Sequence, residues 1–139
     1  MSNKEAFIKM MATQNATHAA EQEHAYAFAR ATEDLFTQIQ TWAEGVDGLE
    51  VSAFLVDIEQ GKIHYQAYGF SAKFGDKSVM FVPVTHAVMH YQGTGDLKGL
   101  RLPTSLNFKR DDGQWVIARN GERTALDEES FFALLTDAK

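Results

Sequence analysis

Two histidines spaced four residues apart, His86 and His90, are the first candidates for chemistry in this chain. The same spacing on a helix is used by zinc sites, but the glutamate that follows the first histidine in the H-E-x-x-H motif is absent. The valine-rich surroundings favour a strand, and the expected register places His64 on the opposite face. We therefore predict no metal site and no cofactor, with both histidines at a core edge or pocket rim, where hydrogen bonds satisfy them.

A second pair, Asp57 and His64, would be cross-strand neighbours if Gln60-Gly61 forms the two-residue loop of a hairpin. A carboxylate can orient an imidazole for acid–base catalysis, but no serine, cysteine or lysine nucleophile stands out nearby. We interpret the pair as structural. The glycines of residues 93–99 fit neither of the common phosphate-binding patterns, so we predict no catalytic site from this sequence.

The composition is that of an ordinary globular chain, and it excludes several classes of function. The absence of cysteine excludes disulfides, a thiol nucleophile and thiolate metal sites. The net charge is −6 and no basic stripe is present, so we expect no nucleic-acid partner. No signal peptide and no apolar run of about 20 residues is evident, so we expect a soluble, cytoplasmic protein with no membrane partner.

The first third of the chain is predicted to be helical. A capping box begins at Ser2, and the polar residues 13–18 interrupt the apolar stripe, so we expect two helices. One unbroken helix over residues 3–44 is the alternative. The apolar face of the second helix, which should pack on a sheet, comprises Ala25, Phe28, Leu35, Ile39 and Trp42.

The remaining residues predict an antiparallel sheet of about five strands and a C-terminal helix capped at Asp127 or Thr124. Pro83 cannot donate a hydrogen bond within a sheet and marks an edge or a bulge. Residues 92–103 are expected to form a flexible loop. We predict a single α+β domain over residues 1–139 with the element order ααβββ-loop-ββα.

Strand alternation divides this predicted sheet into two faces. The core face is expected to comprise Phe54, Val56, Ile58, Ile63, Tyr65, Val82, Val84, His86 and Val88. We expect the N-terminal segment to cover the second face, because a bare apolar patch of that size is unusual on a monomer. The cover should be partial, because the apolar stripe of this segment lapses between Met11 and Ala25. The exposed remainder would be a homodimer or partner interface. Its apolar residues are Tyr68, Phe70, Phe81, Met89 and Tyr91.

Two known architectures are similar to this arrangement. N-terminal helices before a curved sheet, with residues 110–117 as a late hairpin, resemble NTF2-like proteins, which implies a cone-shaped pocket for a small ligand. The terminal helix after that hairpin departs from their usual ending. The small acidic α/β format also resembles bacterial secretion chaperones, but the helix between their third and fourth strands is missing.

Two functions follow from these features. The first is a non-enzymatic protein-binding module, such as an inhibitor, an immunity-type protein or a chaperone-like adaptor. It rests on the aromatic residues of the second face, the net negative charge and the absence of a catalytic motif. The alternative is a small-ligand-binding or enzymatic pocket on the concave face of the sheet. Its predicted lining is Tyr65, His86, His90 and Trp115.

Overall fold

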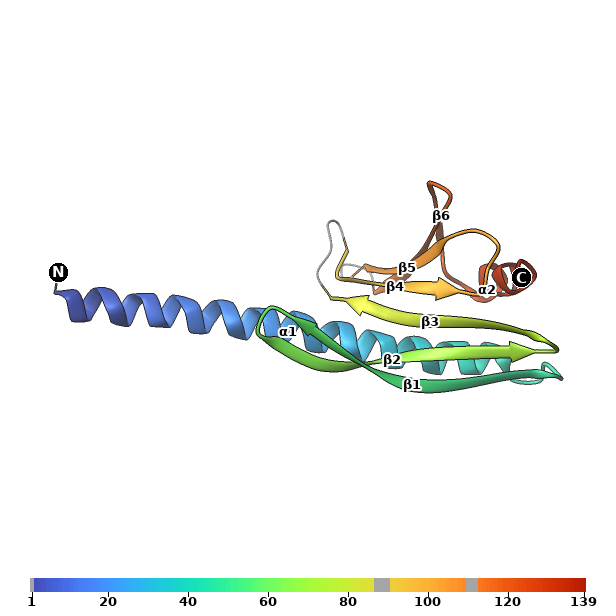
Figure 1. Ribbon diagram of the computed structural model, residues 1–139, viewed down its shortest axis with the longest axis horizontal. Coiled ribbons are helices and arrows are strands. Elements are labelled where there is room, and N and C mark those ends of the chain that lie inside the picture. The colour runs from blue at the N-terminus through green and yellow to red at the C-terminus, as the bar shows by residue number, and fades with distance from the viewer. Residues whose placement is uncertain (1, 87–90, 110–112) are drawn as a thin grey trace.

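A computed structural model describes residues 2–86, 91–109 and 113–139. In this part of the chain one long helix precedes an antiparallel sheet of seven strands, and a short helix follows it (Figure 1). The predicted α+β class is confirmed, with seven strands rather than about five. The strands are ordered in the sheet as they are in the sequence. The elements are α1 (Asn3–Ala43), β1 (Leu49–Gln60), β2 (Ile63–Phe74), β3 (Lys77–Thr85), β4 (Gly93–Lys98), β5 (Thr104–Lys109), β6 (Gln114–Arg119), β7 (Glu122–Ala125) and α2 (Glu128–Leu135).

The helix α1 is continuous over 41 residues. The predicted break at residues 13–18 is therefore wrong, and the alternative of one unbroken helix is confirmed. No glycine or proline lies between Ser2 and Glu44, and the many alanines favour a helix by propensity alone. The Ser2 hydroxyl accepts a hydrogen bond from the amide of Glu5 and caps the first turn. The helix ends before Gly45, which has a φ of 79°.

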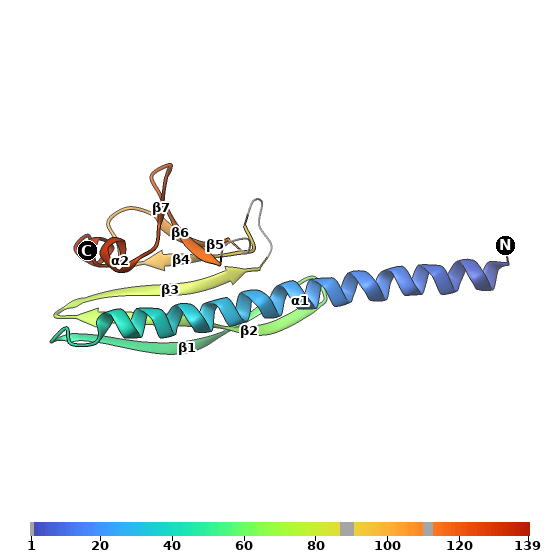
Figure 2. The same cartoon turned by 180° about the vertical axis from the view of Figure 1, so that it is seen from behind.

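The two halves of α1 have different surroundings. Figures 1 and 2 show the C-terminal half lying along one face of the sheet, while the N-terminal half extends past it with no other segment alongside. Every side chain that the structure describes between Asn3 and Ala20 is exposed, and we call this segment the arm. The predicted packing of Phe28 and Leu35 against the sheet is confirmed, since both are buried. Trp42 is half-buried and packs against Phe131 of α2.

The hairpin of β1 and β2 turns at Gly61-Lys62, one residue later than predicted. Gly61 has a φ of 61°, which glycine adopts without steric cost. Asp57 consequently lies opposite Gln66, whose amide donates to the Asp57 carboxylate at 3.0 Å. His64 lies opposite Glu59, so the predicted pairing of Asp57 with His64 is wrong. The shift preserves strand alternation, and the predicted core side chains Ile58, Ile63 and Tyr65 are buried.

Pairing between β2 and β3 extends from Phe74 back to Phe70. At Gly69 an added Cβ would lie 2.6 Å from the carbonyl oxygen of Phe81, so only glycine permits the strands to approach this closely. The next amide, that of Tyr68, donates instead to the Thr32 hydroxyl on α1 at 2.9 Å. The helix therefore satisfies a backbone group that the sheet leaves open.

Burial along β2 does not alternate throughout. Ile63, Tyr65 and Ala67 are buried with exposed or half-buried residues between them, whereas all four residues from Gly69 to Ala72 are buried. The alternation set by the first hairpin therefore does not carry over to β3, and Val84 is 47% exposed instead of buried. The pairing of β3 with β4 shifts register between Pro83 and Thr85, so of the alternatives that the sequence left open for Pro83, an edge or a bulge, the structure shows the bulge.

The predicted loop at residues 92–103 is wrong in its first half, which forms β4. Its glycines make room for aromatic rings. A Cβ at Gly93 would overlap the ring of Phe28, and a Cβ at Gly95 would overlap the ring of Phe81. The glycines therefore permit close packing here, rather than flexibility.

The C-terminal elements follow local sequence signals. Asn120-Gly121 joins β6 to β7 with φ values of 53° and 79°, the conformation of a type I′ turn. This Asn-Gly signal for a further strand was not used in the prediction. Asp127 caps α2 as predicted, in a reciprocal capping box with Ser130.

Candidate functional site

A buried polar cluster lies where β2, the end of β3 and α1 approach one another. The Tyr65 hydroxyl is 3.0 Å from Nδ1 of His86, and the two rings meet edge to face with centroids 5.3 Å apart. Both side chains are buried. Glu21 and His24 of α1 are near enough to influence the charge of His86. We call Tyr65, His86, His24 and Glu21 the Tyr65–His86 cluster.

The surroundings of Tyr65 and His86 favour the uncharged forms of these two side chains. Burial lowers the pKa of His86 below its usual value near 6.5, nearby His24 lowers it further, and Glu21 opposes the shift. Burial raises the pKa of Tyr65 far above its usual range. A neutral Tyr65 hydroxyl can therefore donate to a neutral His86 imidazole. This hydrogen bond satisfies two buried polar groups, which is a structural role.

The four residues of the predicted ligand pocket do not form one described site. Tyr65 and His86 are in contact, whereas His90 lies outside the described residues. Trp115 instead belongs to an aromatic cluster. Its ring centroid lies 5.2 Å from Phe108, 5.7 Å from Phe81 and 6.0 Å from Phe28.

The five residues of the predicted interface are also dispersed. Phe70 and Phe81 stack in the core with 1% and 0% exposure, so their predicted place on an open face is wrong. Tyr68 is half-buried, and Met89 lies outside the described residues. Tyr91 is half-buried, and the guanidinium of Arg123 lies 5.6 Å from its ring centroid. The arm covers none of the four that are described, because it extends away from the sheet (Figure 1).

A groove lies between α1 and the C-terminal strands, and sequence reasoning did not predict it. Two aromatic contacts connect α1 to the C-terminal part of the fold, Phe28 with Trp115 and Trp42 with Phe131. Between these contacts lies a cavity of about 470 Å³. We call it the α1–β6 groove. The sequence signal for it is weak, because Trp115 and α1 meet only through tertiary packing.

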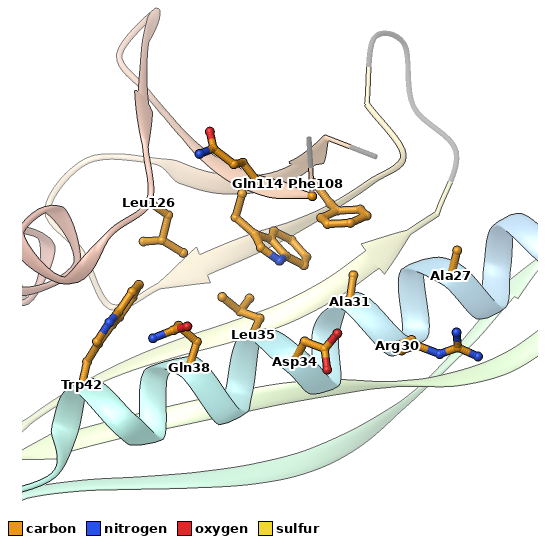
Figure 3. A pocket seen from close by; sticks show the side chains of 12 residues that line it. Ala27, Arg30, Ala31, Asp34, Leu35, Gln38, Trp42, Phe108, Gln114 and Leu126 are labelled. Carbon is orange, nitrogen blue, oxygen red and sulfur yellow. The ribbon is translucent and has the colours of Figure 1, made fainter. Parts of the chain in front are cut away.

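The floor of the α1–β6 groove is apolar and its helical side is polar. Figure 3 shows Leu35 and Trp42 of α1 facing Leu126 across the cavity, which Trp115 also lines. Arg30, Asp34 and Gln38 lie along the helix beside them. An apolar floor with a mixed polar rim suits an amphipathic ligand or segment.

The arm carries four of the ten large apolar side chains that are exposed in the described part of the chain. Its four large apolar side chains are 57%, 55%, 48% and 38% exposed, and they are Phe7, Ile8, Met10 and Met11. Three of them, Phe7, Met10 and Met11, have the i, i+3, i+4 spacing that places side chains on one side of a helix. The apolar pattern predicted that this segment would cover the second face of the sheet in part, which is wrong because the arm extends past the sheet.

Comparison with known proteins gives no relative. No protein-family model, curated protein or solved structure matches the chain, so neither resemblance suggested by the sequence gains support. Within the described residues, no three histidine, cysteine, aspartate or glutamate side chains are grouped to hold a metal ion. No helix in the described part of the chain is both long and apolar enough to cross a bilayer.

Proposed function

We propose that this protein is a non-enzymatic protein-binding module, an inhibitor, immunity-type protein or adaptor, that recognises its partner through the arm. The observation that carries the proposal is the exposure of Phe7, Ile8, Met10 and Met11 on the arm, the part of α1 that has no other described element beside it.

The arm is a projecting helix whose apolar side chains are exposed. Helices in proteins gain most of their stability from packing an apolar face, and the arm packs none of its own. The arm is continuous with the C-terminal half of α1, which packs on the sheet and which we call the docked half. This continuity removes the free-energy cost of nucleating the helix, so the arm is already ordered for binding. An apolar face at i, i+3 and i+4 is the form in which helices enter the grooves of partner proteins.

The test is affinity capture from the native cell with three forms of the full chain as bait. These are the unmodified chain, the double variant Phe7→Asp/Met10→Asp, and Ala16→Asp, which adds a negative charge on the opposite side of the same exposed helix. We expect the unmodified chain and Ala16→Asp to retain the same protein, and the double variant to lose it. Equal recovery by all three baits, or by none, would contradict recognition through the arm.

A second candidate function, binding of a small apolar ligand, is favoured by the α1–β6 groove. Both tryptophans of the chain, Trp42 and Trp115, line this cavity, so its occupancy can be followed by their fluorescence. We expect 1-anilinonaphthalene-8-sulfonate to bind with energy transfer from tryptophan. Leu126→Asp, at the half-buried edge of the groove, should abolish this transfer. A transfer signal of equal size in Leu126→Asp would place the dye elsewhere.

A further inference from the structure

We propose that the partner of the arm is a second copy of this chain, and that each arm lies in the α1–β6 groove of the other copy. This inference rests on the proposed function, because it identifies the protein that the arm recognises. The two copies would be related by a twofold axis, with their α1 helices antiparallel.

The lengths of the two surfaces agree. At a rise of 1.5 Å per residue, the arm from Asn3 to Ala20 is roughly 27 Å long. The groove extends along α1 from Ala27 to Trp42, roughly 23 Å by the same rise. The arm ends where the docked half of α1, which packs on the sheet, begins. Antiparallel copies would therefore place each arm beside the docked half of the other copy.

The spacing of apolar residues along α1 supports the same pairing. Phe7 and Met10 precede Phe28 and Ala31 by three heptads, so they belong to one seam, which drifts around a straight helix by roughly 20° per heptad. Farther along this seam, Leu35 and Trp42 line the groove and have the same heptad spacing.

The middle of the seam is polar, which favours two separate apolar contacts over one long coiled coil. Gln14, Glu21 and His24 occupy it, between the apolar part on the arm and the apolar part at the groove. Antiparallel pairing brings the arm of each copy to the groove of the other. The dimer would therefore contain two equivalent contacts, and each of them would cover the apolar side chains of one arm and of one groove.

Charge is complementary between the two halves of α1. The arm carries Lys4 and Lys9 against Glu5, which makes it a basic segment of an acidic chain. The docked half carries an acidic excess, with only Arg30 opposing it. Its acidic residues are Glu21, Glu23, Glu33 and Asp34. Antiparallel pairing with Phe7 close to Leu35 places Lys9 near Asp34, an attractive contact at the rim of the groove.

The first experiment measures self-association by sedimentation velocity. We expect the unmodified chain and Ala16→Asp to form dimers, and Phe7→Asp/Met10→Asp to sediment as a monomer with an unchanged circular dichroism spectrum. Leu126→Asp alters the groove instead of the arm and should also weaken the dimer. A monomer at high concentration for the unmodified chain, or a dimer in every variant, would overturn the proposal.

The second experiment determines which surfaces meet, and the absence of native cysteines makes it specific. Lys9→Cys and Asp34→Cys chains are oxidised separately and as a mixture. Only the mixture should give a covalent dimer, because a disulfide requires Cα atoms within about 7 Å. In the proposed register, two copies of the same cysteine would be separated by roughly 37 Å along the helices.

The two experiments separate this inference from the proposed function. A covalent dimer of Lys9→Cys alone would show that the arms pair with each other, and it would overturn the groove as their site. A monomeric chain that still captures a cellular protein through Phe7 and Met10 would overturn self-association while supporting the arm as a recognition element. A monomer that captures nothing would contradict both.

Discussion

The Tyr65 hydroxyl and Nδ1 of His86 lie 3.0 Å apart in a region of the fold that disfavours charge on either group. The pair joins the first hairpin to the end of β3, beyond the point where β2 and β3 are paired. A hydrogen bond between neutral side chains therefore connects two strands that share no backbone hydrogen bonds there.

Acid should destabilise the fold through His86. Its folded pKa is lower than its unfolded value near 6.5, so the unfolded chain binds the proton more readily. The contribution of His86 to the free energy of unfolding is therefore fully present above about pH 6.5 and falls as the pH decreases below it. Urea unfolding between pH 8 and 5 should show a smaller loss of stability for His86→Gln than for the unmodified chain.

The matched control for this prediction is His64→Gln, since His64 is exposed on the outer face of the hairpin. Its unfolding should keep the pH dependence of the unmodified chain. An identical pH dependence in His86→Gln would show that another group is responsible, and His24 of the same cluster would be the next to substitute.

Thr32→Val should destabilise the protein by about 1–3 kcal/mol, because the amide of Tyr68 loses its hydrogen-bond partner inside the fold. The two side chains have nearly the same shape, so little packing changes. Thr37→Val is the control, since Thr37 is exposed and bonds only to the helix carbonyl of Glu33 in the described contacts. Chemical denaturation of both variants measures the difference, and equal midpoints would contradict the role given to Thr32.

Gly93→Ala should cost about 1–3 kcal/mol, because the added methyl group overlaps the buried ring of Phe28. Phe28→Leu removes that ring and should be destabilising by itself. The double variant should be more stable than the sum of the two effects predicts. Additive unfolding free energies would show that β4 does not pack on α1 through this contact.

Leu35→Ala and Met11→Ala provide a comparison between the two halves of one helix. Leu35 is buried, so its truncation should cost about 2–5 kcal/mol. Met11 is on the arm, and its truncation should change the unfolding free energy of the monomer by less than about 0.5 kcal/mol. Denaturation at a protein concentration that keeps the chain monomeric measures both, and equal losses would show that the arm is packed.

The sequence by itself determined the elements that depend on local interactions. The capping residues Ser2 and Asp127 begin the two helices, and the Gly75-Asp76 turn joins β2 to β3. Apolar spacing predicted the buried side of α1 at Phe28 and Leu35, because a 3.6-residue period does not depend on what covers it. The bulge after Pro83 also followed from the missing amide.

The tertiary structure decided the features that depend on distant contacts. The amide of Tyr68 donates to Thr32 of α1, just beyond the paired part of β2 and β3, and Phe70 and Phe81 are buried in the core instead of lying on an open face. Gly93 and Gly95 gave the sequence signal of a loop, yet they form a strand because aromatic rings from other elements fill the space above them. The arm and the groove likewise follow from where the sheet ends along α1, which no local pattern encodes.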